Sequence, residues 1–165
     1  MKGKATFVAV PLLVVAALIA SLHGWEQRVY TTYWDALGQV DTACAGVTGE
    51  GVIPGKTYTK AECDALEGRY IARMYDRMGR CVPNAEMEFH EIKAWGHFAY
   101  NVGETNFCRS TAAKLLNAGQ NKAACKQIPK WRFVKGKDCA VRANKCYGIV
   151  RRRAWEYSTC TGEMG

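Results

Sequence analysis

Eight cysteines in a chain of 165 residues constrain the fold of this protein more than any other feature of its sequence. Their number is even, and no two of them have the C-x-x-C spacing that is typical of zinc sites. Such a set predicts a framework of disulfides, which forms in an oxidising compartment. We therefore expect an exported domain that holds no metal and no other cofactor.

Spacing suggests partners for the cysteines but does not determine them. Cys139 and Cys146 are near enough in sequence to close a small loop, and the other bridges would join neighbouring elements. Three pairs are predicted in this way: Cys139–Cys146, Cys108–Cys125 and Cys44–Cys63. The two cysteines that remain, Cys81 and Cys160, would form the fourth pair.

The N-terminal segment has the composition of an export signal. Lys2 and Lys4 precede the uncharged stretch 5–22, which at about 18 residues is just long enough to cross a bilayer as a helix. Lysines at this end predict that the N-terminus stays in the cytoplasm while the rest of the chain is exported. We expect a transmembrane signal-anchor over residues 1–23 and one exported domain over residues 24–165.

Two other interpretations of this segment stay open. A cleaved signal peptide requires small residues before the cut, a rule that Leu18-Ile19-Ala20 meets poorly. A plain helix of the domain core is the third interpretation. Five alanines make the stretch only weakly apolar, since each missing buried methylene forfeits about 0.8 kcal/mol of transfer free energy. An anchor of this composition would be able to leave the membrane.

Beyond residue 24 the patterns predict a mainly helical domain with one small β-region, an α+β layout. Residues 25–33 are expected to continue the first helix or to begin a short new one, and the stretch 35–58 is rich in turn and strand formers. Thr59 and Glu62 have the spacing of a capping box, which predicts a helix from there to about Met78, ended by Gly79. Further helices are expected over residues 86–100, 110–117, 122–128 and 151–160.

Two carboxylic acids and a threonine near the predicted helix-to-strand junction are the residues best suited to chemistry. They are Glu26, Asp35 and Thr42. Cleavage of a glycosidic bond usually takes two carboxyl groups, one that donates a proton to the leaving oxygen and one that handles the water or the developing positive charge. Spacing by itself does not distinguish such a pair from two solvated acids.

The segments around these residues resemble the phage lysozymes of glycoside hydrolase family 24. As at the start of that family, Glu26 is followed by eight residues and then by Asp35. The further segments that look like lambdoid-phage endolysins are Thr42-Ala43-Cys44-x-Gly46-x-Thr48-Gly49, Pro54-Gly55-Lys56-x-Tyr58-Thr59, Phe98-Ala99-Tyr100-Asn101-Val102-Gly103 and Leu116-Asn117-Ala118-Gly119. The resemblance covers residues 24–160.

The resemblance implies a lysozyme-like fold and hydrolysis of the β-1,4 bond between N-acetylmuramic acid and N-acetylglucosamine. It implies that Glu26 is the general acid, that Asp35 positions the water or stabilises charge, and that Thr42 helps to hold the water. The family is similar to inverting glycosidases, whose carboxyl groups lie about 6.5–9.5 Å apart to leave room for that water.

The resemblance also implies partners and a location. The expected partners are the glycan strands of peptidoglycan and, through the N-terminal segment, the host inner membrane. A monomer would face the periplasm from that membrane and then be released into it. Nucleic acid is not an expected partner, although the net charge of +8 predicts attraction to anionic surfaces in general.

The chain departs from the family pattern beside the three candidate residues. The differences are Gln27 in place of a glycine, Arg28 one position early, Val47 in place of a histidine, and one extra residue, such as Gln39, between the aspartate and the threonine. The extra residue leaves Asp41 as an alternative to Thr42. Two other function classes stay open: a wall-binding membrane protein that has lost catalysis, and a lytic transglycosylase, which needs a single acid.

Other residues that attract attention have ordinary explanations. The arginine run 151–153 is interpreted as a solvated helix face, with phosphate binding as the alternative. The aromatic group Trp95, Phe98 and Tyr100 fits the core face of a helix better than a sugar platform. His90 lacks the second histidine, four residues further on, that a zinc-protease helix needs.

Overall fold

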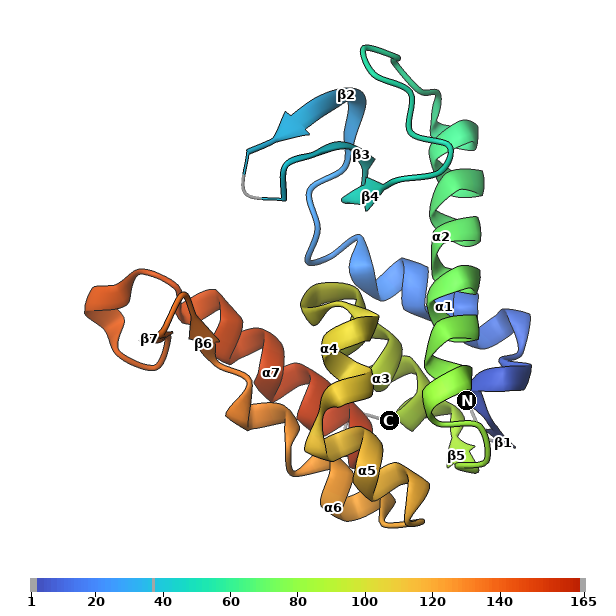
Figure 1. Cartoon of the computed structure of the whole chain (residues 1–165), viewed down its shortest axis with the longest axis vertical. Coiled ribbons are helices and arrows are strands. Elements are labelled where there is room, and N and C mark those ends of the chain that lie inside the picture. Colours follow the sequence, from blue (N-terminus) through green and yellow to red (C-terminus); the bar gives the residue numbers. More distant parts are fainter. Residues whose placement is uncertain (1–2, 37, 164–165) are drawn as a thin grey trace.

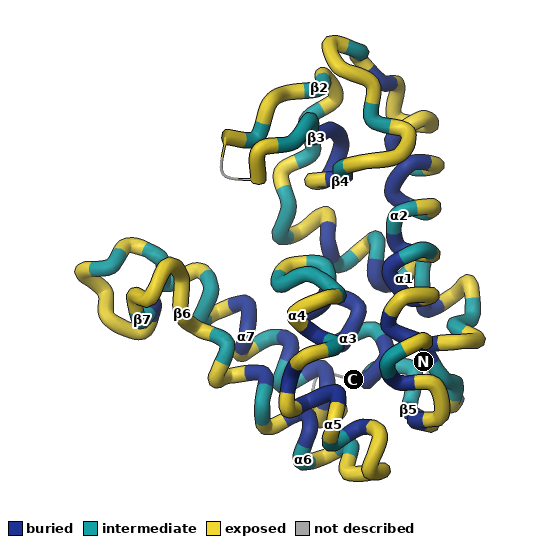
Figure 2. Tube along the Cα trace, in the orientation of Figure 1, coloured by how far each residue is buried: buried dark blue, intermediate teal, exposed yellow. Residues whose placement is uncertain are grey.

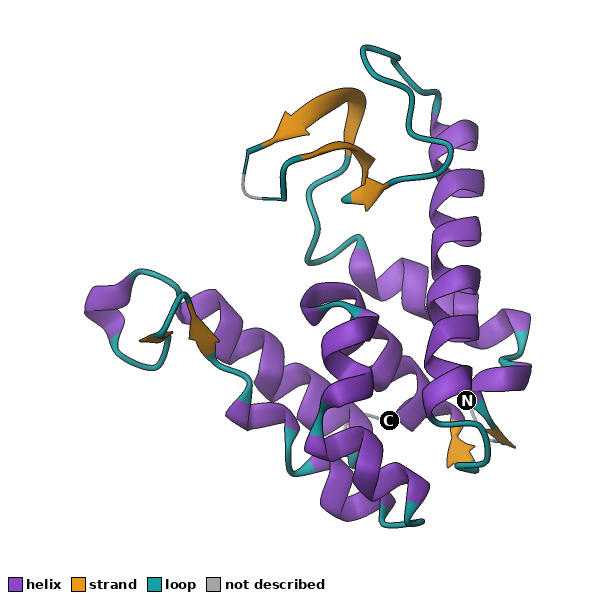
Figure 3. Cartoon of the chain, in the orientation of Figure 1, coloured by secondary structure: helices purple, strands orange, loops and turns teal. Residues whose placement is uncertain are grey.

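The computed structural model of the chain describes residues 3–36 and 38–163. The protein is mainly helical, with short strands (Figure 3). The helices are α1 (Leu12–Leu22), α2 (Lys60–Cys81), α3 (Phe89–Val102), α4 (Glu104–Arg109), α5 (Thr111–Asn117), α6 (Asn121–Cys125) and α7 (Tyr147–Cys160), with single 3-10 turns at η1 (Phe7–Ala9), η2 (Ile128–Lys130) and η3 (Arg142–Asn144). The predicted α+β class is confirmed.

The strands form small antiparallel sheets. The largest has the order β2 (Val29–Asp35), β3 (Val40–Cys44) and β4 (Val47–Thr48). The other pairs are β1 (Lys4–Ala5) with β5 (Met87–Glu88), and β6 (Phe133–Val134) with β7 (Lys137–Asp138). Helix α2 runs beside both the β2–β4 sheet and the other helices (Figure 1), so it joins the β-region to the helical part of the molecule.

Helix α3 lies at the centre of the hydrophobic core, where α1, α2 and α7 pack against it (Figure 2). Its residues Trp95 and Phe98 are fully buried, as predicted for a core face. Gly96 permits the close approach of α2, because a Cβ atom at this position would lie 2.1 Å from the hydroxyl of Tyr75. That hydroxyl donates a hydrogen bond to the carbonyl of Ile92, which ties the two helices together.

Helix α2 begins where the capping box predicts. The Thr59 hydroxyl accepts the N–H of Glu62 at 3.2 Å, and the Glu62 carboxylate accepts the N–H of Thr59 at 2.7 Å. The prediction that Gly79 ends the helix is wrong, because α2 continues to Cys81. Gly79 is buried against η1, where its missing side chain leaves space for Val8. This glycine therefore serves packing and does not end the helix.

The N-terminal segment does not form the continuous helix expected over residues 5–22. It begins with β1 and η1, and α1 starts only after Pro11, which occupies the N-cap. Proline lacks an N–H and restricts the preceding residue to extended conformations, so a helix cannot run through this point. Val14, Leu18 and Leu22 pack one face of α1 into the core. Within the described residues, no helix is both long enough and apolar enough to cross a membrane.

The remaining helices appear close to the predicted positions, with ends shifted by a few residues. Residues 29–35 form strand β2 and not the expected helix, because a run of β-branched and aromatic residues favours an extended, half-buried surface. The sequence patterns give no sign of α4, which is short and is separated from α3 by Gly103 at φ 86°.

All eight cysteines are paired. The bridges are Cys44–Cys63, Cys81–Cys108, Cys125–Cys160 and Cys139–Cys146. The first and the last are as predicted, whereas the predicted pairs Cys108–Cys125 and Cys81–Cys160 are wrong. The physical reason is that the end of α2 lies beside α4, while the end of α6 lies beside the end of α7. Both are tertiary neighbours that spacing along the chain does not report.

Candidate active site

Glu26 lies just after α1, in the turn that leads to the β-region. Its backbone N–H donates to the carbonyl of Leu22 at 2.8 Å, which extends the last helical turn to this residue. The Glu26 side chain is 26% exposed. It borders a cavity of about 430 Å³ whose other lining residues are Gln27, Val29, Tyr33 and Gly46. The cavity therefore lies where the end of α1 meets strand β2 and the β3–β4 turn.

An arginine from the last helix holds the Glu26 carboxylate. Nη1 of Arg152, on α7, donates to Oε1 of Glu26 at 2.6 Å. The Arg152 side chain is only 7% exposed, and its Nε lies 3.4 Å from Oε1 of Glu156, one helical turn further on. A charge-assisted bond of this length restrains the position of the carboxyl group. The acid at the cavity is thus fixed by a nearly buried cation.

Behind Arg152 lies a buried charged cluster formed by α3 and α7. Nδ1 of His97 lies 2.8 Å from Oε1 of Glu156, and Nε of Arg153 lies 2.8 Å from Oε2 of the same carboxylate. Burial lowers the pKa of His97 and also that of Arg153. The rings of Trp25 and Trp155 pack against His97. The cluster therefore connects the Glu26–Arg152 pair to the protein interior.

A second buried carboxylate, Glu67 on α2, holds the chain on both sides of Glu26. Its Oε2 lies 2.9 Å from Nε2 of His23, and Arg28 donates to both of its oxygens, from Nε at 2.8 Å and from Nη2 at 2.9 Å. Oε1 also accepts the N–H of Ala45, in the turn before β4, at 3.1 Å. Glu67 is 2% exposed. Segment 23–28, the β3–β4 turn and α2 are thus joined at one carboxylate.

The register of β2 and β3 places the two other candidate residues on one face. Residues directly opposite each other in an antiparallel pair project to the same side. Thr42 lies opposite Tyr33, whose side chain borders the Glu26 cavity. Asp35 shares this side, because it lies two residues beyond Tyr33 on the same strand. Asp41 lies opposite Trp34 and projects to the other side.

The extra residue of this region is accommodated in the turn between β2 and β3. Gln39 has φ 51°, in the left-handed region that turns use, and the pairing resumes with Asp35 opposite Val40. Thr42 is buried, and its hydroxyl donates to the carbonyl of Val40 at 3.3 Å. Of the predicted site residues, Glu26 borders the cavity directly. Asp35 and Thr42 lie on the same face of the β2–β3 pair as Tyr33, which lines the cavity.

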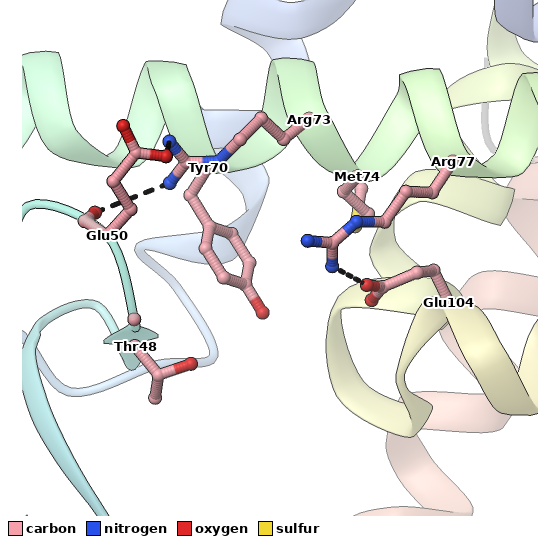
Figure 4. A pocket seen from close by; sticks show the side chains of 8 residues that line it. Thr48, Glu50, Tyr70, Arg73, Met74, Arg77 and Glu104 are labelled. Carbon is pink, nitrogen blue, oxygen red and sulfur yellow. Dashed lines mark hydrogen bonds and ion pairs between the residues drawn. The ribbon is translucent and has the colours of Figure 1, made fainter.

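A second cavity, of about 290 Å³, lies against α2 (Figure 4). Its lining includes Thr48, which is two residues beyond Gly46 of the first cavity. Nη1 of Arg73 donates to the Glu50 carboxylate at 3.1 Å, and Arg77 pairs with Glu104 at the start of α4. Arginines of one helix therefore reach the β-region and the helical part of the molecule. The full lining is Thr48, Gly49, Glu50, Tyr70, Arg73, Met74, Arg77 and Glu104.

Sequence reasoning does not find the residues that hold the site in place. The interpretation of the arginine run as a solvated face is wrong for Arg152 and Arg153, which are buried, and holds for Arg151. A signal was present, because side chains three and four residues apart on a helix can pair, as these two arginines do with Glu156. For Glu67 no such signal exists, since His23 lies 44 positions away.

One group of potential metal ligands lies together among the described residues: Cys44, Cys63 and Glu67. The two cysteines form a disulfide, so they offer no thiolate to a metal. Glu67 is engaged with His23 and Arg28. This group does not fit a metal site.

A mainly helical domain with a small antiparallel sheet, and a fixed glutamate at a cavity beside that sheet, defines the lysozyme-like class. Solved structures share this fold. The muramidase domain of SpmX from Asticaccaulis excentricus has a TM-score of 0.72 at 19% identity, covering 92% of this chain and 97% of that one. A mutant of P22 lysozyme has a TM-score of 0.71 at 23% identity, covering 88% of this chain and 96% of that one. The predicted lysozyme-like fold is confirmed.

The model of the phage lysozyme family matches residues 22–156. The SAR-endolysin of bacteriophage PS119 is 35% identical over 139 residues, which are 83% of this chain and 77% of that protein. A probable prophage lysozyme of Escherichia coli strain K12 is 36% identical over 136 residues, 79% and 75% of the two chains. The chain therefore belongs to the phage lysozyme family. It is a glycoside hydrolase that degrades peptidoglycan, so the predicted family, enzyme class and function are confirmed.

Proposed function

We propose that this lysozyme cuts the β-1,4 bond between N-acetylmuramic acid and N-acetylglucosamine with inversion, and that Glu26 is its general acid. One observation carries the proposal: the Glu26 carboxyl group borders the cavity beside the β-region and is held there by Arg152. With a glycan strand in this cavity, Oε1 of the protonated Glu26 carboxyl group accepts the Arg152 N–H, and Oε2 carries the proton that passes to the glycosidic oxygen as the bond breaks.

Asp35 and Thr42 act on the water in this proposal. Asp35 supplies the second carboxyl group, and the Thr42 hydroxyl orients the attacking water. The strand register supports Thr42 over Asp41, because Thr42 shares the side of Tyr33 and Asp41 does not. Two polar groups on the strand face that carries Tyr33 support hydrolysis, which leaves reducing sugar ends. A lytic transglycosylase would leave anhydro-muramic ends and would need no Asp35.

The test replaces Glu26 with glutamine, which keeps the shape and removes the proton. General acid catalysis contributes about 10²–10⁴-fold, so hydrolysis of purified peptidoglycan should fall by that factor while the circular dichroism spectrum is unchanged. The matched control is Glu86→Gln, an exposed carboxyl group outside the cavity, which should keep parental activity. Full activity of Glu26→Gln would refute the assignment.

We further propose that the protein is a host-lysis endolysin that begins as a membrane-anchored precursor and ends as a periplasmic monomer. Residues 1–23 would be the anchor and residues 24–165 the catalytic domain. Relatives named SAR-endolysin support this order of events. Leu12 and Val8 also support it, since they are 86% and 66% exposed in the folded chain and would be covered by lipid in the precursor.

Three exposed alanines allow a clean test of the anchor. Ala9, Ala16 and Ala20 face solvent in the folded protein, so leucine at these positions does not enter the core. Each replacement adds about 2 kcal/mol of apolar transfer free energy, which should retain the precursor in the membrane and delay lysis. Serine at the same positions is the matched control and should not delay it. Equal lysis times for the leucine and serine variants, with both exported, would contradict anchor release.

A further inference from the structure

The chain between η2 and α7 projects from the body of the molecule (Figure 1), and we call its residues 130–147 the basic arm. Its basic side chains are Lys130, Arg132, Lys135, Lys137, Arg142 and Lys145. Asp138 is its one acidic side chain, so six positive charges less one negative give a net charge of +5. This short segment therefore carries most of the net charge of +8 of the whole chain.

Most of these cations have no acidic partner. Asp138 is occupied by Arg132, which donates to its two carboxylate oxygens at 3.0 and 3.1 Å. Lys135, Lys137 and Lys145 are exposed, and in the part of the chain that the structure describes no carboxylate lies within ion-pair distance of them. Their charges add to one positive potential that extends into solvent.

Exposed apolar side chains lie among these cations. Phe133 is 59% exposed, Val134 is 40% exposed and Val141 is 51% exposed. Each has a basic residue adjacent or two positions away in the sequence. Apolar side chains flanked by lysines and arginines are typical of surfaces that rest in the interfacial layer of a bilayer, where the chains enter the lipid and the charges meet phosphates.

The arm is cross-linked within itself, although it projects. The Cys139–Cys146 bridge closes its loop, and the Asn144 side chain donates to the carbonyl of Asp138 at 2.7 Å. The N–H of Cys139 donates to the carbonyl of Arg132 at 2.9 Å, which holds the hairpin closed. A surface that is ordered before binding loses less conformational entropy when it binds.

We propose that the basic arm docks on the surface of an anionic phospholipid bilayer. Charge complementarity identifies the lipid as anionic, and the three exposed apolar side chains favour a bilayer over the carboxylates of peptidoglycan stem peptides, which would bind the cations alone. Because the arm projects from the body of the molecule, it can contact a broad surface such as a bilayer without obstruction by the rest of the protein. The proposal does not depend on Glu26, and it would keep the lysozyme at the membrane face after any release of its N-terminal segment.

Flotation of the full-length, oxidised protein with phospholipid vesicles tests the proposal. The arm variant carries Lys135→Gln, Lys137→Gln, Arg142→Gln and Lys145→Gln. The matched control removes four exposed cations elsewhere, through Arg80→Gln, Lys114→Gln, Lys122→Gln and Lys126→Gln. The parent should bind vesicles that contain phosphatidylglycerol and not vesicles of phosphatidylcholine alone. Each basic residue near an anionic surface contributes about fivefold, so the arm variant should bind several hundredfold more weakly than the control.

Since the N-terminal apolar segment is identical in all three proteins, the difference between them reports the arm. Equal vesicle binding by the arm variant and the control would overturn the proposal. So would equal binding of the parent to neutral and anionic vesicles. Loss of binding to purified peptidoglycan in the arm variant, without vesicle binding by the parent, would also overturn it and identify the wall as the partner.

Discussion

Replacing Glu67 with glutamine tests how much the chain around Glu26 depends on one buried charge. The side chain is 2% exposed, its oxygens contact His23, Arg28 and the N–H of Ala45, and Arg28 itself is 14% exposed. Breaking a buried ion pair typically costs about 3–5 kcal/mol when the other charge is left unpaired, and because Arg28 keeps Asp64 as a second partner at 2.5 Å we expect the lower end, about 3 kcal/mol. For a protein of this size that loss corresponds to a fall of roughly 10 °C in the melting temperature.

Thermal unfolding of the oxidised protein, followed by circular dichroism, measures this effect. The matched control is Asp76→Asn, which removes an exposed carboxylate from the same helix and should change the free energy of unfolding by less than about 1 kcal/mol. A double-mutant cycle with Arg28→Met should give a coupling free energy above about 1 kcal/mol. A melting temperature for Glu67→Gln within a degree or two of the parent would show that these contacts contribute little, and the reasoning would fail.

The other predictions concern pH, core packing and a bridge. Burial lowers the pKa of His97 from the ordinary histidine value of about 6.5. Below that pH the unfolded chain binds a proton that the folded protein does not, so the contribution of His97 to the free energy of unfolding is fully present above about pH 6.5 and is lost as the pH falls. His97→Asn should therefore flatten the decline in melting temperature between about pH 7 and pH 5, and an unchanged slope would contradict the explanation. Leu18→Ala should lower the free energy of unfolding, measured by chemical denaturation, by about 2–5 kcal/mol, because the Leu18 side chain is completely buried on the core face of α1. Leu12→Ala, at the exposed start of the same helix, should lower it by less than about 1 kcal/mol. Serine in place of Cys125 and Cys160 should lower the free energy of unfolding by about 2–5 kcal/mol, and a loss no larger than that caused by a surface substitution would contradict the assigned structural role.

Features that depend on neighbouring residues could be predicted from the sequence. The start of α2 is specified by Thr59 and Glu62 within one turn, and the structure confirms it. The small loop closed by Cys139 and Cys146 is equally local. The motif around Glu26 was recognisable because the lysozyme family keeps the spacing to the next carboxylate.

Features that depend on tertiary neighbours could not be predicted. An apolar stretch gives the same signal whether it enters a bilayer or a protein core, so composition alone could not place α1 against α3. The choice between Asp41 and Thr42 requires the register of β3, which is set by the turn at Gln39. The role of Glu67 depends on a fold that brings α2 beside the segment on either side of Glu26.

The bond between Glu26 and Arg152 joins residues 126 positions apart, and this separation sets an order of events during synthesis. A protein chain is made from its N-terminus, so Glu26 is synthesised long before Arg152. A chain interrupted before α7 has the glutamate but not the cation that fixes it. We therefore expect truncated products to be inactive. Within a cell that is producing this lysozyme, only the molecules with a complete and docked α7 would be able to act on the wall.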